Sequence, residues 1–308
     1  MKIISIINQK GGVGKTTSAI NVGAALTLLK KKVLLLDLDP QGNLSSGLNL
    51  DPEALEDKNS YFCLVEDNAK AKDYILKTAI DGLDVIGATN NLAGAEIELV
   101  NVMVGREFRL KEALTNTGED YDYVLIDCPP SLGLLTLNAL CASNSYLIPM
   151  QSEFFALQGL AHIMKTAKMI KKHLNQELSL EGIVLTMFDS RSNLAKQVYQ
   201  EIKDFAGNKL FHSVVPRRIR LSESTSHGVP GVFYDPACLA SRSYIEIARE
   251  LIQRQNGEEI TLKKQSFLPP DPIDRLSFKK NQETKVESKI ISLEKTQSDK
   301  KSPIQANK

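Results

Sequence analysis

The segment Lys10-Gly11-Gly12-Val13-Gly14-Lys15-Thr16-Thr17 is the most informative stretch of this chain, because it joins a short apolar run to a long helical pattern. Glycines let backbone N–H groups turn inward around a phosphate, and a helix N-terminus behind them adds further donors. The spacing follows the GxxxxGK(S/T) loop except at its first glycine, where Gln9 stands. In such a loop Lys15 reaches the β- and γ-phosphates and the Thr16 hydroxyl is a ligand of Mg²⁺. We therefore expect an ATP site.

Two further runs end in carboxylates where a phosphate-transfer site needs them. The second run closes with Asp37-Leu38-Asp39-Pro40-Gln41-Gly42-Asn43, and the run Val124-Leu125-Ile126 leads into Asp127. Phosphoryl transfer to water requires a positioned nucleophile and compensation of the phosphate charge. Because the carboxyl ends of parallel strands line the ligand crevice of an open α/β sheet, we expect Asp127 to hold Mg²⁺ through water beside Thr16.

Short apolar runs alternate with longer amphipathic segments up to about residue 255. The predicted strands are Lys2–Asn8, Val33–Asp39, Leu83–Ala88, Tyr123–Asp127, Ser145–Met150, Gly182–Phe188 and Val214–Pro216. The predicted helices are Thr16–Leu29, Leu92–Leu114, Leu132–Ala142, Ala156–Leu174, Asn193–Phe205 and Pro236–Gln255. Near-continuous apolar strands separated by helices predict an α/β fold with a doubly wound, mostly parallel sheet and helices on both faces.

Charge is distributed unevenly along the 308 residues. The whole chain has a formal net charge of +1, which excludes a protein whose entire surface is a polycation. Residues 257–308 carry 11 basic and 8 acidic side chains, whereas residues 1–256 carry 27 and 29. Pro269, Pro270 and Pro272 interrupt any helix there, and polar residues follow. We therefore predict an ATPase domain over 1–256 and a basic, mostly disordered tail over 257–308.

The cysteine pattern indicates a reducing compartment, and the apolar segments predict neither a membrane-spanning helix nor a signal peptide. Cys63, Cys128, Cys141 and Cys238 form no CxxC pair, so neither a disulfide framework nor a zinc knuckle is expected. No stretch approaches the roughly 18 apolar residues of a membrane-spanning helix, and the first apolar run is too short for a signal peptide. The expected location is cytoplasmic.

The loop contains an additional lysine, Lys10, which lies between Gln9 and the double glycine. With this lysine the loop resembles the deviant Walker A motif of the ParA/MinD branch of P-loop ATPases. The resemblance implies that Lys10 reaches the nucleotide of a partner copy in an ATP-sandwich dimer and that Gly12 permits the close approach. It assigns Asp39 to the attacking water and Asp37 to the magnesium shell. Catalysis is then assigned to Lys10, Lys15 and Asp39. The implied ATP-binding residues are Lys10, Gly11, Gly12, Val13, Gly14, Lys15, Thr16 and Thr17, with metal contacts from Thr16, Asp37 and Asp127.

Three downstream stretches, Gln151–Leu160, Thr186–Leu194 and Val215–Glu223, resemble the ParA/Soj partitioning ATPases, and the resemblance covers about residues 1–255. In that family, arginines of the last two stretches bind DNA without sequence preference once ATP has closed the dimer. The matching positions are Arg191, Arg217 and Arg220, and Pro216 and Arg217 correspond to nucleotide-contacting positions. The chain departs from the family at Ser224-Thr225, where Ala-Pro is usual, and at Arg218, where Asn is common.

The implied function is ATP-dependent DNA partitioning. An ATP–Mg²⁺ homodimer binds nucleoid DNA, and a ParB-type centromere-binding protein stimulates an intrinsically slow hydrolysis that releases it. The protein is expected to associate with the nucleoid and not with a membrane. Because the first strand begins at the N-terminus of the sequence, operator binding through an N-terminal extension is not expected.

Three alternatives remain open at this point. A MinD-like ATPase that positions a cargo at a membrane needs a C-terminal amphipathic helix, for which Val286–Lys295 is the best, weakly apolar candidate. An electron-transfer relative needs two thiolates per subunit for an iron–sulfur cluster, and only Cys128 and Cys141 are available. A DNA-binding scaffold that uses ATP structurally would lack turnover.

Overall fold

The computed structural model describes residues 1–115, 117, 120–258 and 260. The strands are β1 (Lys2–Ile6), β2 (Val33–Asp37), β3 (Leu76–Lys77), β4 (Leu83–Ile86), β5 (Tyr123–Asp127), β6 (Ser145–Gln151) and β7 (Ser179–Thr186). The helices are α1 (Lys15–Leu28), α2 (Asn43–Gly47), α3 (Pro52–Asp57), α4 (Ser60–Val65), η1 (Ala71–Tyr74), α5 (Leu92–Asn101), α6 (Arg109–Leu114), α7 (Leu134–Ala142), α8 (Ala156–His173), α9 (Asn193–Ala206), η2 (Gly207–Lys209), α10 (Ile219–Ser226), α11 (Gly231–Tyr234) and α12 (Leu239–Asn256).

The seven strands form one sheet in the order β3-β4-β2-β5-β1-β6-β7, and every pairing except β3 with β4 is parallel. All residues of β2, β4 and β5 are buried, which explains why these strands are apolar apart from Asp84 in β4 and the aspartates that end β2 and β5. The chain passes from β1 to β2, which lies on one side of β1 in the strand order. It later passes from β5 to β6, which lies on the other side of β1. The C-terminal ends of β1, β2 and β5 therefore meet at the crevice where open α/β sheets bind ligands.

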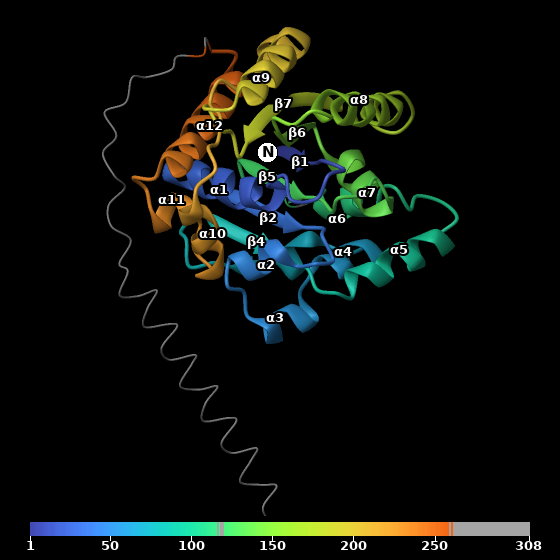
Figure 1. The fold of residues 1–308 in the computed structure, drawn as a ribbon. Helices are drawn as coiled ribbons and strands as arrows, with labels where there is room; N and C mark the ends of the chain where they lie inside the picture. The colour runs from blue at the N-terminus through green and yellow to red at the C-terminus, as the bar shows by residue number, and fades with distance from the viewer. Residues whose placement is uncertain (116, 118–119, 259, 261–308) are drawn as a thin grey trace, which may run out of the picture. The chain divides into compact units, whose positions relative to one another are not determined.

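Helices cover both faces of the sheet, as predicted. Figure 1 shows α1, α11 and α12 on one side, where α1 contacts β2 and β5, and α5, α6 and α7 on the other. The predicted mostly parallel, doubly wound sheet is confirmed. Because α1 packs against both the sheet and α12, its N-terminus is fixed beside the sheet's C-terminal edge.

Two predicted elements are wrong. The single helix predicted over Leu92–Leu114 is two helices, α5 and α6, separated by a segment in which Gly105 takes φ 79°, a left-handed conformation that interrupts an α-helix. The predicted strand Val214–Pro216 makes only an isolated bridge between Phe188 and Pro216. Proline has no N–H to continue a ladder, and Met187, at φ 50°, ends β7 two residues earlier than predicted.

Other features were not predicted. The two-residue strand β3 and the short helices α2, α3, α4, α10 and α11 are too brief for periodicity to detect. Helix α12 ends at Asn256, where Gly257 caps it at φ 66°. The predicted disordered tail otherwise lies outside the described residues. Within the described part of the chain, no helix is both long and apolar enough to cross a membrane.

Candidate nucleotide site

The loop between β1 and α1 has the conformation that a phosphate cradle requires. Gly12 and Gly14 adopt φ 72° and 87°, in the left-handed region that side chains other than glycine rarely occupy, and Gly14 is the N-cap of α1. Lys15, the first residue of the helix, is 6% exposed, and its Nζ lies 3.4 Å from the Lys10 carbonyl oxygen. Burial lowers the pKa of Lys15, an effect that Asp127, Cys128 and Asp39 partly oppose. This arrangement presents backbone N–H groups and one buried cation to an anion.

Residues from β6 and β7 hold this loop in place. Gln151 Nε2 donates to the Gly12 carbonyl oxygen at 3.0 Å. The Thr186 hydroxyl donates to the Val13 carbonyl oxygen at 2.7 Å and lies 3.2 Å from that of Met150. Sequence reasoning gave neither side chain a role, although both lie in stretches that resemble the ParA/Soj proteins. Their contacts fix the loop before any ligand binds.

Asp37 is fully buried at the end of β2 and is held by Ser45 of α2. Its Oδ2 accepts hydrogen bonds from the Ser45 backbone N at 3.1 Å and hydroxyl at 2.9 Å, and its Oδ1 accepts one from the Asp39 N. Burial raises the pKa of Asp37 to about 7, against the lowering effect of these bonds. Ser45 also accepts a bond from the Ala88 N at 2.8 Å, so one hydroxyl ties α2 to the end of β4. No local motif identified Ser45.

Asp127 lies directly opposite Asp37 in the pairing of β2 with β5 and is also fully buried. Among the described residues, neither of its carboxylate oxygens accepts a hydrogen bond of ordinary geometry. Burial and the charge of Asp37 raise its pKa well above the usual range, while the nearby Thr16 hydroxyl and Lys15 ammonium lower it. Unpaired buried carboxylate oxygens beside a threonine hydroxyl fit Mg²⁺, which binds through one or two carboxylates plus substrate phosphates.

Asp39 lies two residues beyond Asp37, just after the end of β2. It is 7% exposed, its Oδ1 accepts a hydrogen bond from the Gln41 N at 3.0 Å, and its charge acts on Lys15. The turn that follows it is closed by Gly42, whose N donates to the Asp39 carbonyl oxygen at 2.9 Å. This turn leaves the Asp39 carboxylate close enough for its charge to act on Lys15. Within the described residues, no three acidic, histidine or cysteine side chains form a metal cluster of their own.

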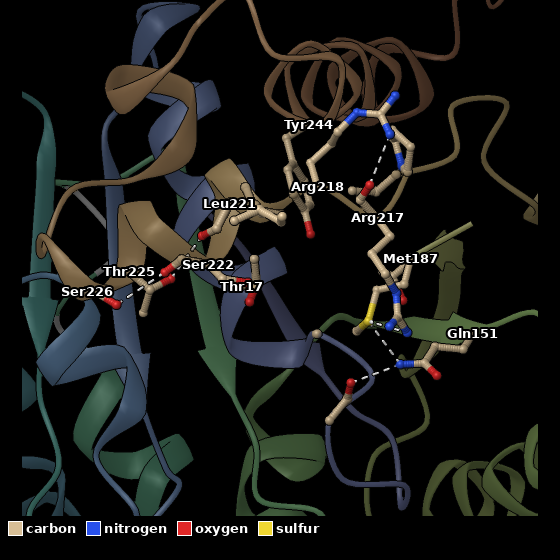
Figure 2. A pocket seen from close by; sticks show the side chains of 16 residues that line it. Thr17, Gln151, Met187, Arg217, Arg218, Leu221, Ser222, Thr225, Ser226 and Tyr244 are labelled. Atoms are coloured by element: carbon tan, nitrogen blue, oxygen red, sulfur yellow. Dashed lines mark hydrogen bonds between the residues drawn. The ribbon is translucent and has the colours of Figure 1, made fainter. Parts of the chain in front are cut away.

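A pocket of about 650 Å³ opens beside the phosphate loop (Figure 2). That volume lies in the range of small-molecule sites. Its wall includes Gly12 and Thr17 of the loop region and, from the opposite side, Pro216 and Arg217, the two predicted nucleotide contacts. Tyr244 of α12 also lines it, and the Tyr244 and Ser18 hydroxyls are 3.2 Å apart. The structure therefore brings the distant 215–226 segment to the same hollow as the phosphate loop.

Lys10 points away from the buried cluster and forms an ion pair with Glu153, in the connection between β6 and α8. Both side chains are about half exposed, at 54% and 52%. Such a pair contributes little to stability because water screens both charges. Gln9, which replaces the first glycine of the motif, has its Oε1 2.6 Å from His162 Nδ1 of α8. The exposed half of the loop is thus held by polar contacts that cost little to break.

The three predicted DNA-binding arginines are all exposed, and two are already paired. Arg191 is bidentate to Asp189, with two bonds of 3.0 Å, and it lowers the pKa of Asp189 to about 2. Arg220 bonds Glu223 at 3.0 Å and lies 3.8 Å from Asp235. Arg217 contacts Met187, and no carboxylate partner of Arg217 is found among the described residues. These pairs partly neutralise the charges of Arg191 and Arg220.

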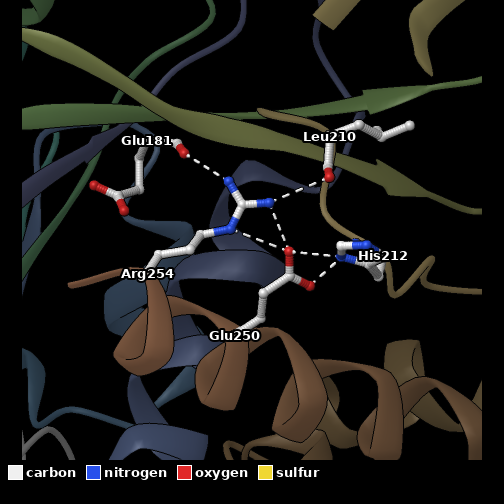
Figure 3. Close-up of polar contacts among 5 residues, drawn as sticks. All are labelled: Glu181, Leu210, His212, Glu250 and Arg254. Carbon is white, nitrogen blue, oxygen red and sulfur yellow. Dashed lines mark hydrogen bonds and ion pairs between the residues drawn. The ribbon is translucent and has the colours of Figure 1, made fainter. Parts of the chain in front are cut away.

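A buried network anchors the segment that carries Arg217 and Arg220 (Figure 3). Glu250 of α12 accepts bonds from Arg254 Nη2 at 2.6 Å and from the His212 N at 3.0 Å. Arg254 also donates to the carbonyl oxygens of Glu181 and Leu210, both at 3.2 Å. The chain that leads into the 215–220 stretch is therefore tied to the same helix that packs on α1.

The structure bears on the electron-transfer alternative. Cys128 and Cys141 are buried in the core, 0% and 1% exposed, and burial raises the pKa of both thiols. Neither thiol is accessible to a cluster shared between subunits. The segment Val286–Lys295, on which a membrane-positioning protein would depend, lies outside the described residues.

Comparison with known proteins defines the class. A family model described as an AAA domain matches residues 1–180. The cobyrinic acid a,c-diamide synthase of Mycobacterium smegmatis with bound ADP and magnesium superposes with a TM-score of 0.73 at 32% identity, covering 86% of this chain and 100% of that one. The septum site-determining protein MinD of Pyrococcus horikoshii, complexed with Mg-ADP, gives 0.67 at 26% identity, covering 83% and 97%. The chain is a P-loop ATPase of the deviant Walker A type.

Curated relatives identify the branch. The sporulation initiation inhibitor protein Soj of Bacillus subtilis is 50% identical over 250 residues, which are 81% of this chain and 98% of that protein. The chromosome partitioning protein ParA of Myxococcus xanthus is 47% identical, covering 82% and 88%, and that of Caulobacter vibrioides is 42% identical, covering 84% and 97%. The chain belongs to the ParA/Soj family.

Proposed function

We propose that this protein is a DNA-partitioning ATPase, in which an ATP–Mg²⁺ homodimer binds DNA without sequence preference and hydrolysis releases it. The observation that carries the ATPase part is the buried group of Lys15, Asp37 and Asp127 at the mouth of a glycine loop. Burial disfavours unpaired charge, and titratable groups with pKa values perturbed by burial cluster at functional sites. Phosphate and Mg²⁺ would supply the charges that pair with these groups.

Each residue has a definite task in the proposed cycle. Backbone N–H groups of residues 11–16 bind the phosphates and Lys15 neutralises them. Thr16, Asp37 and Asp127 would hold Mg²⁺, which would offset charge on the transferring phosphate. Asp39 orients the attacking water. The base and sugar occupy the pocket beside Pro216 and Arg217.

Lys10 acts between subunits in this proposal. Its ion pair with Glu153 is half exposed, so exchanging Glu153 for the phosphate of a partner copy costs little. Arg191, Arg217 and Arg220 then contact DNA from both copies of the dimer. Because each phosphate contact is weak and salt-dependent, two linked patches bind far better than one. A ParB-type partner stimulates the slow hydrolysis that ends the bound state.

Phosphate release tests this proposal. We compare the full-length wild type, Asp39→Ala and the matched control Asp57→Ala, an exposed carboxylate on α3, with DNA and the cognate ParB-type protein present. We expect Asp57→Ala to match the wild type and Asp39→Ala to lose at least about 100-fold in rate, the scale of one positioned catalytic group. A wild type that releases no more phosphate than Asp39→Ala would show that the protein does not cycle as an ATPase.

A further inference from the structure

Two adjacent aromatic side chains, Phe154 and Phe155, protrude into solvent next to the phosphate loop. They are 76% and 67% exposed, and their rings lie edge to face with centroids 5.0 Å apart. The two adjacent rings form one contiguous apolar patch, and exposed apolar patches are typical of interaction surfaces. They occupy the connection between β6 and α8, which includes Glu153, the partner of Lys10.

The connection that carries the two rings is ordered by its own backbone bonds. The Glu153 N donates to the Gln151 carbonyl oxygen at 3.0 Å, and the Ala156 N donates to that of Glu153 at 2.9 Å. The Phe155 carbonyl oxygen accepts a bond from the Gly159 N at 3.2 Å, inside the first turn of α8. The rings are therefore presented by a fixed turn, so little ordering entropy is lost when they are covered.

A recess lies beside this protrusion. A hollow of about 260 Å³ is lined by Phe155 together with Lys10 and Val13 of the phosphate loop and Gly159 and Leu160 of α8. A Cβ placed on Gly159 would meet nothing within 4 Å, so the hollow is open on this side. The same patch therefore carries a protruding apolar group, an apolar recess, one positive charge and one negative charge.

In a two-fold symmetric dimer, the same patch of each copy contacts that of the other. Such a patch must therefore contain both partners of each contact. We infer that the Phe154–Phe155 pair, with the hollow beside Lys10, is the apolar contact surface for a second copy of this chain. The aromatic pair of each copy packs on the hollow of the other. Lys10, which lines the hollow, then faces the other copy, as the proposed cycle requires. This inference rests on the proposed ATP-dependent dimer and assigns its apolar anchor.

Sedimentation velocity of the full-length protein with Mg²⁺ and a slowly hydrolysed ATP analogue tests it. The test variant is Phe154→Ala/Phe155→Ala, and the matched control is Phe205→Ala, a phenylalanine of α9 that is 57% exposed on another part of the surface. Each substitution occurs twice in a symmetric dimer, so the dimer dissociation constant should rise at least about 30-fold in the test variant and not in the control. Binding of a fluorescent nucleotide to the monomer should match the wild type in both.

Unchanged dimerisation of the double variant overturns the inference and leaves the proposed function intact. A wild type that stays monomeric with the analogue overturns the dimer of the proposed function, and this inference with it. If the double variant folds poorly, the single variant Phe154→Ser, at the more exposed position, replaces it and should weaken the dimer at least about 5-fold. Wild-type dimerisation of that folded variant also overturns the inference.

Discussion

The phosphate end of this protein (Lys15, Asp37 and Asp127) and its arginine surface (Arg191, Arg217 and Arg220) differ in how far their charged groups are exposed to solvent. Lys15, Asp37 and Asp127 are buried, held by the fold and perturbed in pKa before any ligand arrives. Arg191 and Arg220 are 90% and 61% exposed and are balanced by neighbouring carboxylates. A buried site acts through a few strong interactions in a low dielectric, whereas an exposed one needs many weak interactions acting together. In the proposed cycle, a preorganised nucleotide site controls an arginine surface that binds DNA well only when a dimer brings two copies of it together.

The largest expected effect is at the phosphate end. Replacing Lys15 with Ala removes the buried cation that pairs with the bound phosphates, which costs about 2–5 kcal/mol of binding free energy. Nucleotide affinity should therefore fall roughly 30- to 4,000-fold. Titration with a fluorescent ATP analogue measures this, with Lys165→Ala, an exposed lysine of α8, as the control. Equal affinities of Lys15→Ala and the control would remove Lys15 from the nucleotide site.

A smaller effect concerns the pH dependence of the nucleotide-free protein. Burial raises the pKa of Asp37 from 3.8 to about 7, so the folded state holds a proton that the unfolded chain has lost. Stability contributed by this group is therefore present below about pH 4 and is lost as the pH rises to 7. Asp37→Asn cannot ionise, so it should gain at least about 1.4 kcal/mol over the wild type between pH 5 and pH 8.

Urea denaturation at pH 5, 6.5 and 8 measures this difference in the free energy of unfolding. Asp57→Asn, at an exposed position, is the control and should follow the wild type at every pH. A constant difference between Asp37→Asn and wild type across this range would show that Asp37 is ionised throughout. The pKa of Asp37 would then lie closer to its ordinary value than the burial of this side chain implies.

The smallest expected effects are at the arginine surface. Arg191→Ala or Arg220→Ala should each lower the slope of log affinity for DNA against log salt concentration by about one for each DNA phosphate that the arginine neutralises. Affinity should fall several-fold, and nucleotide binding should not change. Arg249→Ala is the control, because Arg249 also pairs with a glutamate three residues away, at 3.2 Å. DNA binding with an unchanged salt slope in both variants would remove these arginines from the interface.

The fold was predictable where one segment contains its own signal. The apolar runs at β1, β2 and β5 and the amphipathic patterns at α8 and α9 gave these elements nearly their observed bounds. The pattern over 92–114 did not reveal the break at Gly105, because the apolar spacing continues across it. At Val214–Pro216, apolar character alone suggested a strand, whereas the end of β7 and the missing proline N–H allow only a bridge.

By itself, the sequence determined the class of chemistry. The glycine loop, Lys15 and Thr16 are contiguous, so their residue types and spacing indicate phosphate binding without reference to the rest of the chain. The tertiary structure alone decided which distant groups complete it: Ser45 on Asp37, Gln151 on the Gly12 carbonyl, and Glu153 on Lys10. These contacts depend on the order of strands in the sheet and on how helices pack against it. Neither is encoded in the spacing of any one segment, because both emerge only when the whole core is buried together.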